Sequence, residues 1–126
     1  MRKNSGFTLI ELIAVMLILA ILAVVAVPQF VDLRTEARNA ATAGVAGALS
    51  SGSALNFANR SLNPANGVAI ANCTDVKNTL QGQVLTGAVG DYAITSAAVA
   101  AGAAKSDCVL TGPGGSTANF TALGIS

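Results

Sequence analysis

The chain has 126 residues, which is enough for one small domain, and only 10% of them are charged. Its net charge is +1, so no basic surface favours nucleic acid as a partner. The sequence has no histidine, which excludes Ser–His and Cys–His nucleophile pairs and histidine metal ligands, and its two cysteines are too few for a four-cysteine zinc site. We therefore expect a protein that is not an enzyme and that uses no metal or other cofactor.

The first element in chain order is an apolar segment over residues 7–27, in which only Thr8 and Glu11 are polar. As an α-helix with a rise of about 1.5 Å per residue, it would be about 30 Å long, which is the thickness of the hydrocarbon core of a bilayer. The segment is apolar on all sides, unlike a surface helix. We therefore predict a membrane-spanning helix over residues 7–28.

The charges on either side of this segment indicate its orientation. Arg2 and Lys3 precede it and the next basic residue is Arg34, which places the N-terminus in the cytoplasm and most of the chain in an oxidising compartment. A cleaved secretory signal is an alternative, but the apolar run exceeds the usual length of about 7–15 residues. An ordinary membrane anchor fits the length. Both alternatives leave Glu11 unexplained, because an acid in lipid costs about 2.5–3.5 kcal/mol.

A specific motif lies at the start of the segment. The basic leader MRKNSG ends at Gly6, and FTLIEL follows, with Phe7 first and Glu11 fifth. From Ser5 to about Phe30 the sequence resembles the precursors of type IV pilins, and the short leader is similar to the type IVa branch. The resemblance implies that a prepilin peptidase cleaves between Gly6 and Phe7, that Phe7 is N-methylated, and that inner-membrane machinery assembles the subunits into a filament.

Glu11 is the only acid in the apolar run and is our candidate assembly residue. Cleavage would expose an α-amine on Phe7 that is largely cationic near neutral pH. A buried carboxylate needs an opposite charge, and this amine is the nearest one available. The pair could form within one subunit or between subunits, and we favour the second because it would set the axial register. Alternatively, Glu11 points towards lipid headgroups on the cytoplasmic side.

Helical spacing continues beyond the membrane segment, over residues 29–60. Pro28 removes a backbone donor, so we expect a kink or local unwinding there. The helix should end near residues 59–62, before Asn63-Pro64. One stripe of this helix consists of Phe30, Leu33, Ala37, Ala41, Val45 and Leu49. A second stripe of small residues, which allows close approach of the head's own sheet or of a neighbouring helix, consists of Ala40, Gly44, Ala48 and Gly52.

The rest of the chain, residues 61–126, has the pattern of a small head with a short helix and several strands. We expect Thr74 to cap the short helix and Gly82 to close it. Strands are predicted at residues 83–86, 92–96, 108–111 and 119–123, with a GPGGS turn between the last two. We expect these strands to form an antiparallel sheet. Because the sheet is too small to stand alone, it should pack on the second half of the long helix. An even pair of cysteines in an oxidising compartment predicts a Cys73–Cys108 disulfide.

Together these elements predict an α+β protein with four parts. They are the leader (1–6), a transmembrane and filament-core helix (7–28), an amphipathic helix (29–60) and a disulfide-bracketed head (61–126). The resemblance favours a structural subunit of a type IV pilus, the major pilin, whose partners are its own copies, the prepilin peptidase, the assembly machinery and the inner membrane. DYAIT around Tyr92 and CVLTG at Cys108 resemble MSHA-type pilins. The alternatives are a pseudopilin of a type II secretion system and a small membrane-anchored or secreted enzyme.

Overall fold

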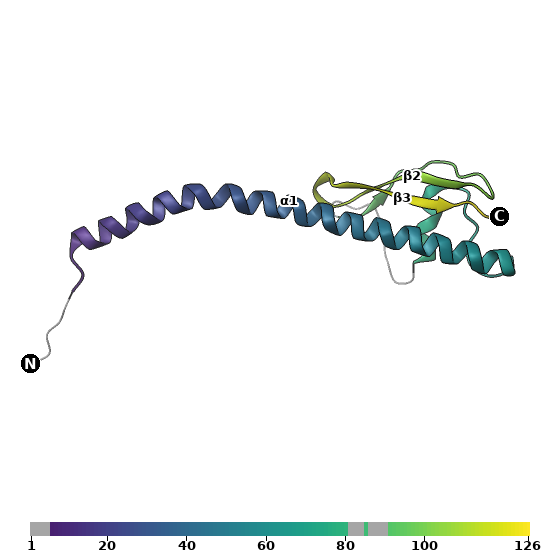
Figure 1. The fold of residues 1–126 in the computed structure, drawn as a ribbon, viewed down its shortest axis with the longest axis horizontal. Coiled ribbons are helices and arrows are strands. Elements are labelled where there is room, and N and C mark those ends of the chain that lie inside the picture. The colour runs from purple at the N-terminus through teal and green to yellow at the C-terminus, as the bar shows by residue number, and fades with distance from the viewer. Residues whose placement is uncertain (1–5, 81–84, 86–90) are drawn as a thin grey trace, which may run out of the picture. The chain divides into compact units, whose positions relative to one another are not determined.

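The computed structural model describes residues 6–80, 85 and 91–126 (Figure 1). The chain divides into two compact units, Met1–Arg34 and Thr35–Ser126, which we describe separately. The elements in chain order are α1 (Leu9–Leu62), the 3-10 helix η1 (Cys73–Thr79), β1 (Ala93–Ile94), β2 (Ala104–Thr111), the 3-10 turn η2 (Pro113–Gly115) and β3 (Thr117–Leu123). A long helix with an apolar N-terminal part and a small antiparallel sheet on its later part confirm the predicted α+β fold.

The first unit is the apolar part of α1. Every large hydrophobic side chain from Phe7 to Val27 is exposed in the isolated subunit. Within the described residues, α1 is the one helix long and apolar enough to cross a membrane. A helix that presents apolar side chains in all directions must be covered by lipid or by other apolar helices, which agrees with the predicted membrane segment.

Pro28 lies inside α1, which remains helical on both sides of it. A proline cannot donate to the carbonyl one turn earlier, so the hydrogen-bond ladder has a weak point near residue 24. We predict that residues 23–28 stretch or unwind when the helix is repacked in a filament, although they are helical in the subunit. A filament density map tests this prediction, and an unbroken regular helix through these residues would contradict it.

The second unit has its core between the sheet and α1. The strands are ordered β1-β2-β3 and both pairings are antiparallel, with Cys108 opposite Phe120 and Leu110 opposite Ala118. Because side chains alternate along a strand, Cys108, Leu110 and Phe120 point to one face of the sheet, where all three are buried. Leu49 of α1 is fully buried in the same cluster. The strands predicted at 92–96, 108–111 and 119–123 are all present, with shifted bounds.

The short helix differs from its prediction in type and in cap. It is a 3-10 helix, and Asn72 rather than Thr74 is its N-cap. The Asn72 side chain accepts from the Thr74 amide at 3.1 Å, and Asp75 accepts from the Asn72 amide at 2.8 Å, so the two form a reciprocal capping box. Asn72 rather than Thr74 is the cap because its side chain also accepts a hydrogen bond from the Ala97 amide at 3.1 Å, which is a tertiary contact. Gly82 and the strand predicted at 83–86 lie outside the described residues, except for Leu85.

The face of α1 that meets the sheet is more polar than the predicted apolar stripe. Val45 and Leu49 of that stripe do pack in the core, but Ala37 and Ala41 are exposed, and the Phe30 side chain lies outside the described part. The buried positions that follow helical spacing instead are Thr42, Ala46, Leu49, Ser53 and Asn56. Counting apolar residues alone missed this face, because its hydroxyl and amide groups are buried together with hydrogen-bond partners.

Two serines of α1 satisfy the free edge of β3. The Thr121 amide donates to Ser50 Oγ at 3.0 Å, and the Leu123 amide donates to Ser53 Oγ at 2.8 Å. These amides point away from β2, so without the serines they would form an open sheet edge. These two hydrogen bonds between α1 and β3, which we call the serine seam, fix the register of the sheet along the helix.

Gly52 lies between Ser50 and Ser53 in the sequence and belongs to the stripe of small residues that was expected to allow close packing. A side chain at Gly52 would come within 2.6 Å of Thr79 Oγ1 and 3.0 Å of the Leu80 side chain. The absence of a side chain at Gly52 therefore allows the end of η1 to pack closely against α1. At Gly44 no described atom lies within 4 Å of the corresponding position, and Ala40 and Ala48 are exposed. Close approach to the head is thus found at Gly52, and packing of the other three against a neighbouring helix stays a prediction.

We predict that Ser53→Ala destabilises the head by about 1–3 kcal/mol, because it leaves the partly buried Leu123 amide without an acceptor. Ser51→Ala is the matched control, since the exposed Ser51 hydroxyl bonds only to the Gly47 carbonyl of its own helix. Chemical unfolding of the full-length protein in detergent, followed by near-ultraviolet circular dichroism, measures the difference. Equal stabilities of the two variants would contradict the role of the serine seam.

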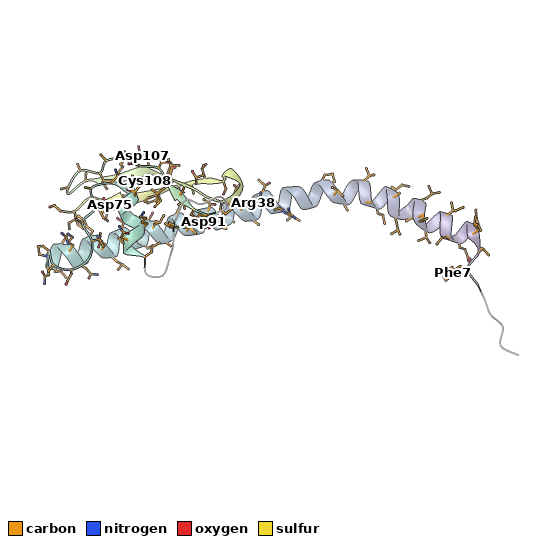
Figure 2. The ribbon with its side chains drawn as sticks, turned by 180° about the vertical axis from the view of Figure 1, so that it is seen from behind. Phe7, Arg38, Asp75, Asp91, Asp107 and Cys108 are labelled. Atoms are coloured by element: carbon orange, nitrogen blue, oxygen red, sulfur yellow. A yellow bond between two sulfur atoms is a disulfide. The ribbon has the colours of Figure 1, made fainter. Side chains whose placement is uncertain are left out.

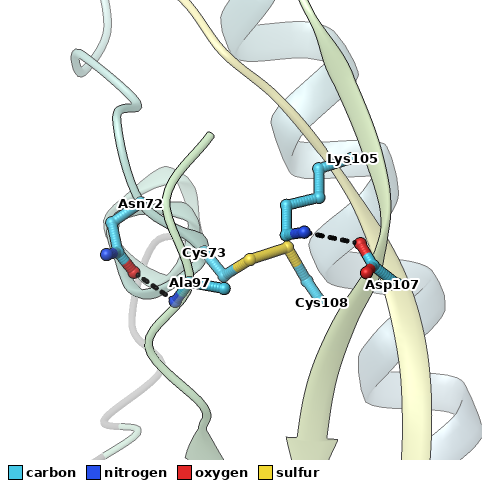
Figure 3. A network of polar contacts seen from close by, with 6 residues as sticks. All are labelled: Asn72, Cys73, Ala97, Lys105, Asp107 and Cys108. Atoms are coloured by element: carbon cyan, nitrogen blue, oxygen red, sulfur yellow. Dashed lines mark hydrogen bonds and ion pairs between the residues drawn. A yellow bond between two sulfur atoms is a disulfide. The ribbon is translucent and has the colours of Figure 1, made fainter. Parts of the chain in front are cut away.

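The predicted disulfide is present between Cys73 and Cys108. The two Cα atoms are 5.7 Å apart and both residues are fully buried, and the bond joins η1 to β2 (Figure 3). Backbone and side-chain bonds support it: the Cys73 amide donates to the Ala97 carbonyl at 2.9 Å, beside the bond from the Ala97 amide to Asn72. The bridge therefore ties η1 to β2, the central strand of the sheet.

We predict that Cys108→Ser destabilises the head by roughly 4 kcal/mol, because the bond closes a loop with a sequence separation of 35 residues. Protein levels should fall with it. Cys73→Ser and the double serine variant are the controls, and all three should be equally destabilised because each removes the same bond. Thiol labelling of both cysteines in the native, unreduced protein would contradict the disulfide.

Candidate processing and assembly site

The predicted cleavage point lies in exposed, non-helical chain. Gly6, Phe7 and Thr8 precede α1 and have no regular secondary structure, and Phe7 is 92% exposed. Figure 2 labels Phe7 beside the start of α1. No described atom lies within 4 Å of the place where a side chain at Gly6 would begin. The fold of the described chain therefore does not itself require glycine at this position.

Thr8 and Glu11 define the start of α1. The Thr8 amide and the Thr8 hydroxyl each donate a hydrogen bond to Glu11 Oε2 at 2.8 Å. In return, the Glu11 amide donates to Thr8 Oγ1 at 3.4 Å. This reciprocal arrangement is a capping box, in which two otherwise unpaired amides at a helix N-terminus are satisfied by side chains. The carboxylate also lies where the helix dipole favours negative charge. Glu11 therefore has partners inside its own subunit.

Sequence reasoning identified Glu11 but missed Thr8. The available signal was the pattern Thr-x-x-Glu immediately before an apolar run, which is typical of a capping box. Because the box starts the helix at Leu9, the Gly6–Phe7 bond stays outside the helix. An exposed bond outside regular secondary structure is the kind of segment that a protease can bind.

The structure contains the uncleaved chain, so the Phe7 nitrogen is a peptide amide rather than an amine. Glu11 bonds to Thr8 in this state. The pair between Glu11 and a Phe7 amine, within or between subunits, stays a prediction for the processed protein, as does the alternative of a Glu11 that faces lipid headgroups.

The acidic residues of the head do not gather into a site. Asp75 accepts from the Ala71 and Asn72 amides, and Asp107 forms an exposed ion pair with Lys105 at 2.9 Å. The hydrogen bond from Lys105, a backbone hydrogen bond and the charge of Lys105 together lower the pKa of Asp107. Among residues 6–80, 85 and 91–126, no group of three or more acids or cysteines could hold a metal ion. Figure 2 shows Asp75, Asp91 and Asp107 at separate places on the head.

Comparison with protein families agrees with this geometry. Residues 1–27 match the prokaryotic N-terminal methylation motif, the signal of type IV pilin-like precursors. Comparison with curated proteins and with solved structures gave no match. The chain therefore carries the precursor signal of a type IV pilin or a pseudopilin-like protein. That signal implies processing by a prepilin peptidase and assembly into a filament, and with α1 it fits anchoring in a membrane before assembly.

Proposed function

We propose that this protein is a structural subunit of a type IV pilus, its major pilin, rather than an enzyme. The observation that carries the proposal is the placement of Glu11. It is the one carboxylate in the otherwise apolar, exposed segment over residues 7–27, and it lies four residues after Phe7, within the methylation motif. In a simple anchor this acid would only cap the start of the helix, against the cost of a charge in lipid, whereas a polymer can also use it to align subunits.

Assembly in this proposal is an exchange of surroundings for the apolar part of α1. In the inner membrane, with the N-terminus in the cytoplasm, lipid covers the exposed apolar side chains of residues 7–27. In the extracellular filament, the same side chains of neighbouring subunits cover one another. The heads, which fold around residues 35–62 of α1, form the outer surface.

Glu11 changes partners during this exchange. Before assembly the Thr8 amide and hydroxyl satisfy its carboxylate, which lowers the cost of keeping it in the membrane. After cleavage, a neighbour's Phe7 amine offers a donor that carries a full positive charge, whereas the Thr8 donors are neutral. The pair would both attract the incoming subunit and fix its register, because a buried carboxylate needs an opposite charge.

A pseudopilin of a type II secretion system is the second candidate, since it shares the N-terminal signal. The disulfide between η1 and β2, together with the resemblance of the segments around Tyr92 and Cys108 to MSHA-type pilins, supports the pilin. In both candidates the apolar helix and the processing site work in the same way, so the heads and the length of the polymer distinguish them.

Electron microscopy of cells at native expression, with an antibody against the head, tests this proposal. We expect long surface fibres that bind the antibody along their length, and their absence from cells that lack the gene. Unlabelled fibres, or no fibres together with a loss of protein secretion, would overturn the assignment in favour of a pseudopilin.

A further inference from the structure

The loop that follows α1 carries an exposed asparagine–glycine pair. Asn66 and Gly67 are both exposed, and among the described residues neither the Asn66 side-chain amide nor the Gly67 backbone N–H has a hydrogen-bond partner. The Asn66 backbone is held in place, because its N–H donates to the Asn63 carbonyl at 2.9 Å. The side-chain amide and the next backbone nitrogen are thus neighbours in sequence and free of competing bonds.

The conformation of the loop requires glycine at position 67. Gly67 has a φ of +72°, a conformation that other residues rarely adopt, and a side chain there would collide with the Asn56 side chain. Asn56 cannot move aside, because it is buried and pairs with both backbone groups of Val68, each at 2.8 Å. The fold therefore requires glycine after Asn66, and glycine leaves the backbone nitrogen of the pair without steric protection.

We propose that Asn66 is a site of spontaneous deamidation in the folded head. The Gly67 backbone nitrogen attacks the side-chain carbonyl carbon of Asn66 and forms a new C–N bond. The bond from that carbon to Nδ2 breaks, and Nδ2 leaves as ammonia with the proton from the Gly67 nitrogen. Water then adds to one of the two carbonyl carbons of the cyclic imide and opens it to aspartate or isoaspartate, so the only co-reactant is water.

The neighbouring Arg60 gives the reaction a structural consequence. Its Nη1 donates to the Asn66 carbonyl at 3.4 Å, and its Nε is buried without a hydrogen-bond partner in the described structure. A carboxylate formed at residue 66 would supply a charged acceptor to the same guanidinium. Each converted subunit also gains one negative charge on its surface, so a polymer of this chain becomes more negative with time after synthesis.

Peptide mass spectrometry after ageing of the folded protein tests the proposal. The full-length protein in detergent and sheared cell-surface material are each aged in mildly alkaline buffer before digestion. We expect the mass gain of an amide-to-acid conversion at Asn66, severalfold faster than at any other asparagine. Two asparagines of the same region are internal controls. Asn63 precedes Pro64, which has no N–H with which to attack, and Asn59 precedes the bulky Arg60.

Two variants separate this reaction from other ageing. Asn66→Asp should match the native-gel mobility of the fully aged wild type from the start, and Asn66→Gln should keep the mobility of fresh protein throughout. The proposal is overturned if Asn66 keeps its amide while Asn59 or another asparagine converts, or if conversion occurs only after the head is unfolded.

Discussion

Replacing Glu11 with leucine is expected to stop filament assembly while leaving membrane insertion and leader cleavage intact. Insertion should be at least as efficient as in the wild type, because an acid in the membrane costs about 2.5–3.5 kcal/mol. Cleavage should persist, because the Gly6–Phe7 bond lies outside the capping box that Glu11 completes. Assembly should fail, because the incoming subunit loses the charge that pairs with a neighbour's Phe7 amine.

Glu11→Gln is the matched control for this prediction. Glutamine has nearly the same shape and can still accept the hydrogen bonds from Thr8, so it preserves the helix start but removes the charge. It should fail to assemble as leucine does. Counting fibres per cell by electron microscopy, with immunoblots for processed subunit in the membrane, measures both variants. Wild-type numbers of fibres from Glu11→Leu would mean that the intersubunit pair does not drive docking.

Replacing Gly6 with valine is expected to leave uncleaved precursor in the membrane and to abolish filaments. Nothing in the described chain occupies the space beside Gly6, so the substitution should not disturb the fold, and its effect should fall on the peptidase. A β-branched side chain beside the scissile bond would occupy space that the enzyme leaves for hydrogen alone.

Gly6→Ala grades this effect, because it adds only one methyl group and should be cleaved more slowly rather than not at all. Gel mobility separates precursor from processed chain, and circular dichroism of the purified precursors should show the same helix content in all forms. Normal processing of Gly6→Val would contradict the assignment of the cleavage site. A loss of helix content would contradict the view that glycine serves the enzyme and not the fold.

Local sequence was sufficient to predict the N-terminal part of the molecule. The length of the apolar run, the position of Glu11 in it and the end of α1 are properties of adjacent residues, and the helix ends at Leu62 as the following Asn63-Pro64 indicated. The disulfide was also predictable, because two cysteines allow only one intramolecular pairing.

The polar contacts of the head were not predictable in the same way. Ser50 and Ser53 meet the β3 edge about seventy residues further along the chain, and nothing near them in sequence marks them as buried. Asn72 displaced Thr74 as the cap for a similar reason, since its bond to Ala97 joins segments 25 residues apart. Thr8 is the exception. Its pattern with Glu11 is local, because Thr-x-x-Glu before an apolar run is itself a capping-box signature.

Mass spectrometry of the N-terminal peptide of the mature protein decides whether this chain is processed at Gly6–Phe7 into a filament subunit. The sample is material sheared from the cell surface, with the membrane fraction as its control. We expect a surface protein that begins at Phe7 and carries an N-methyl group, together with a membrane precursor that begins at Met1. A surface protein that begins at Val27 or Gln29, after removal of the whole apolar segment, would contradict this expectation.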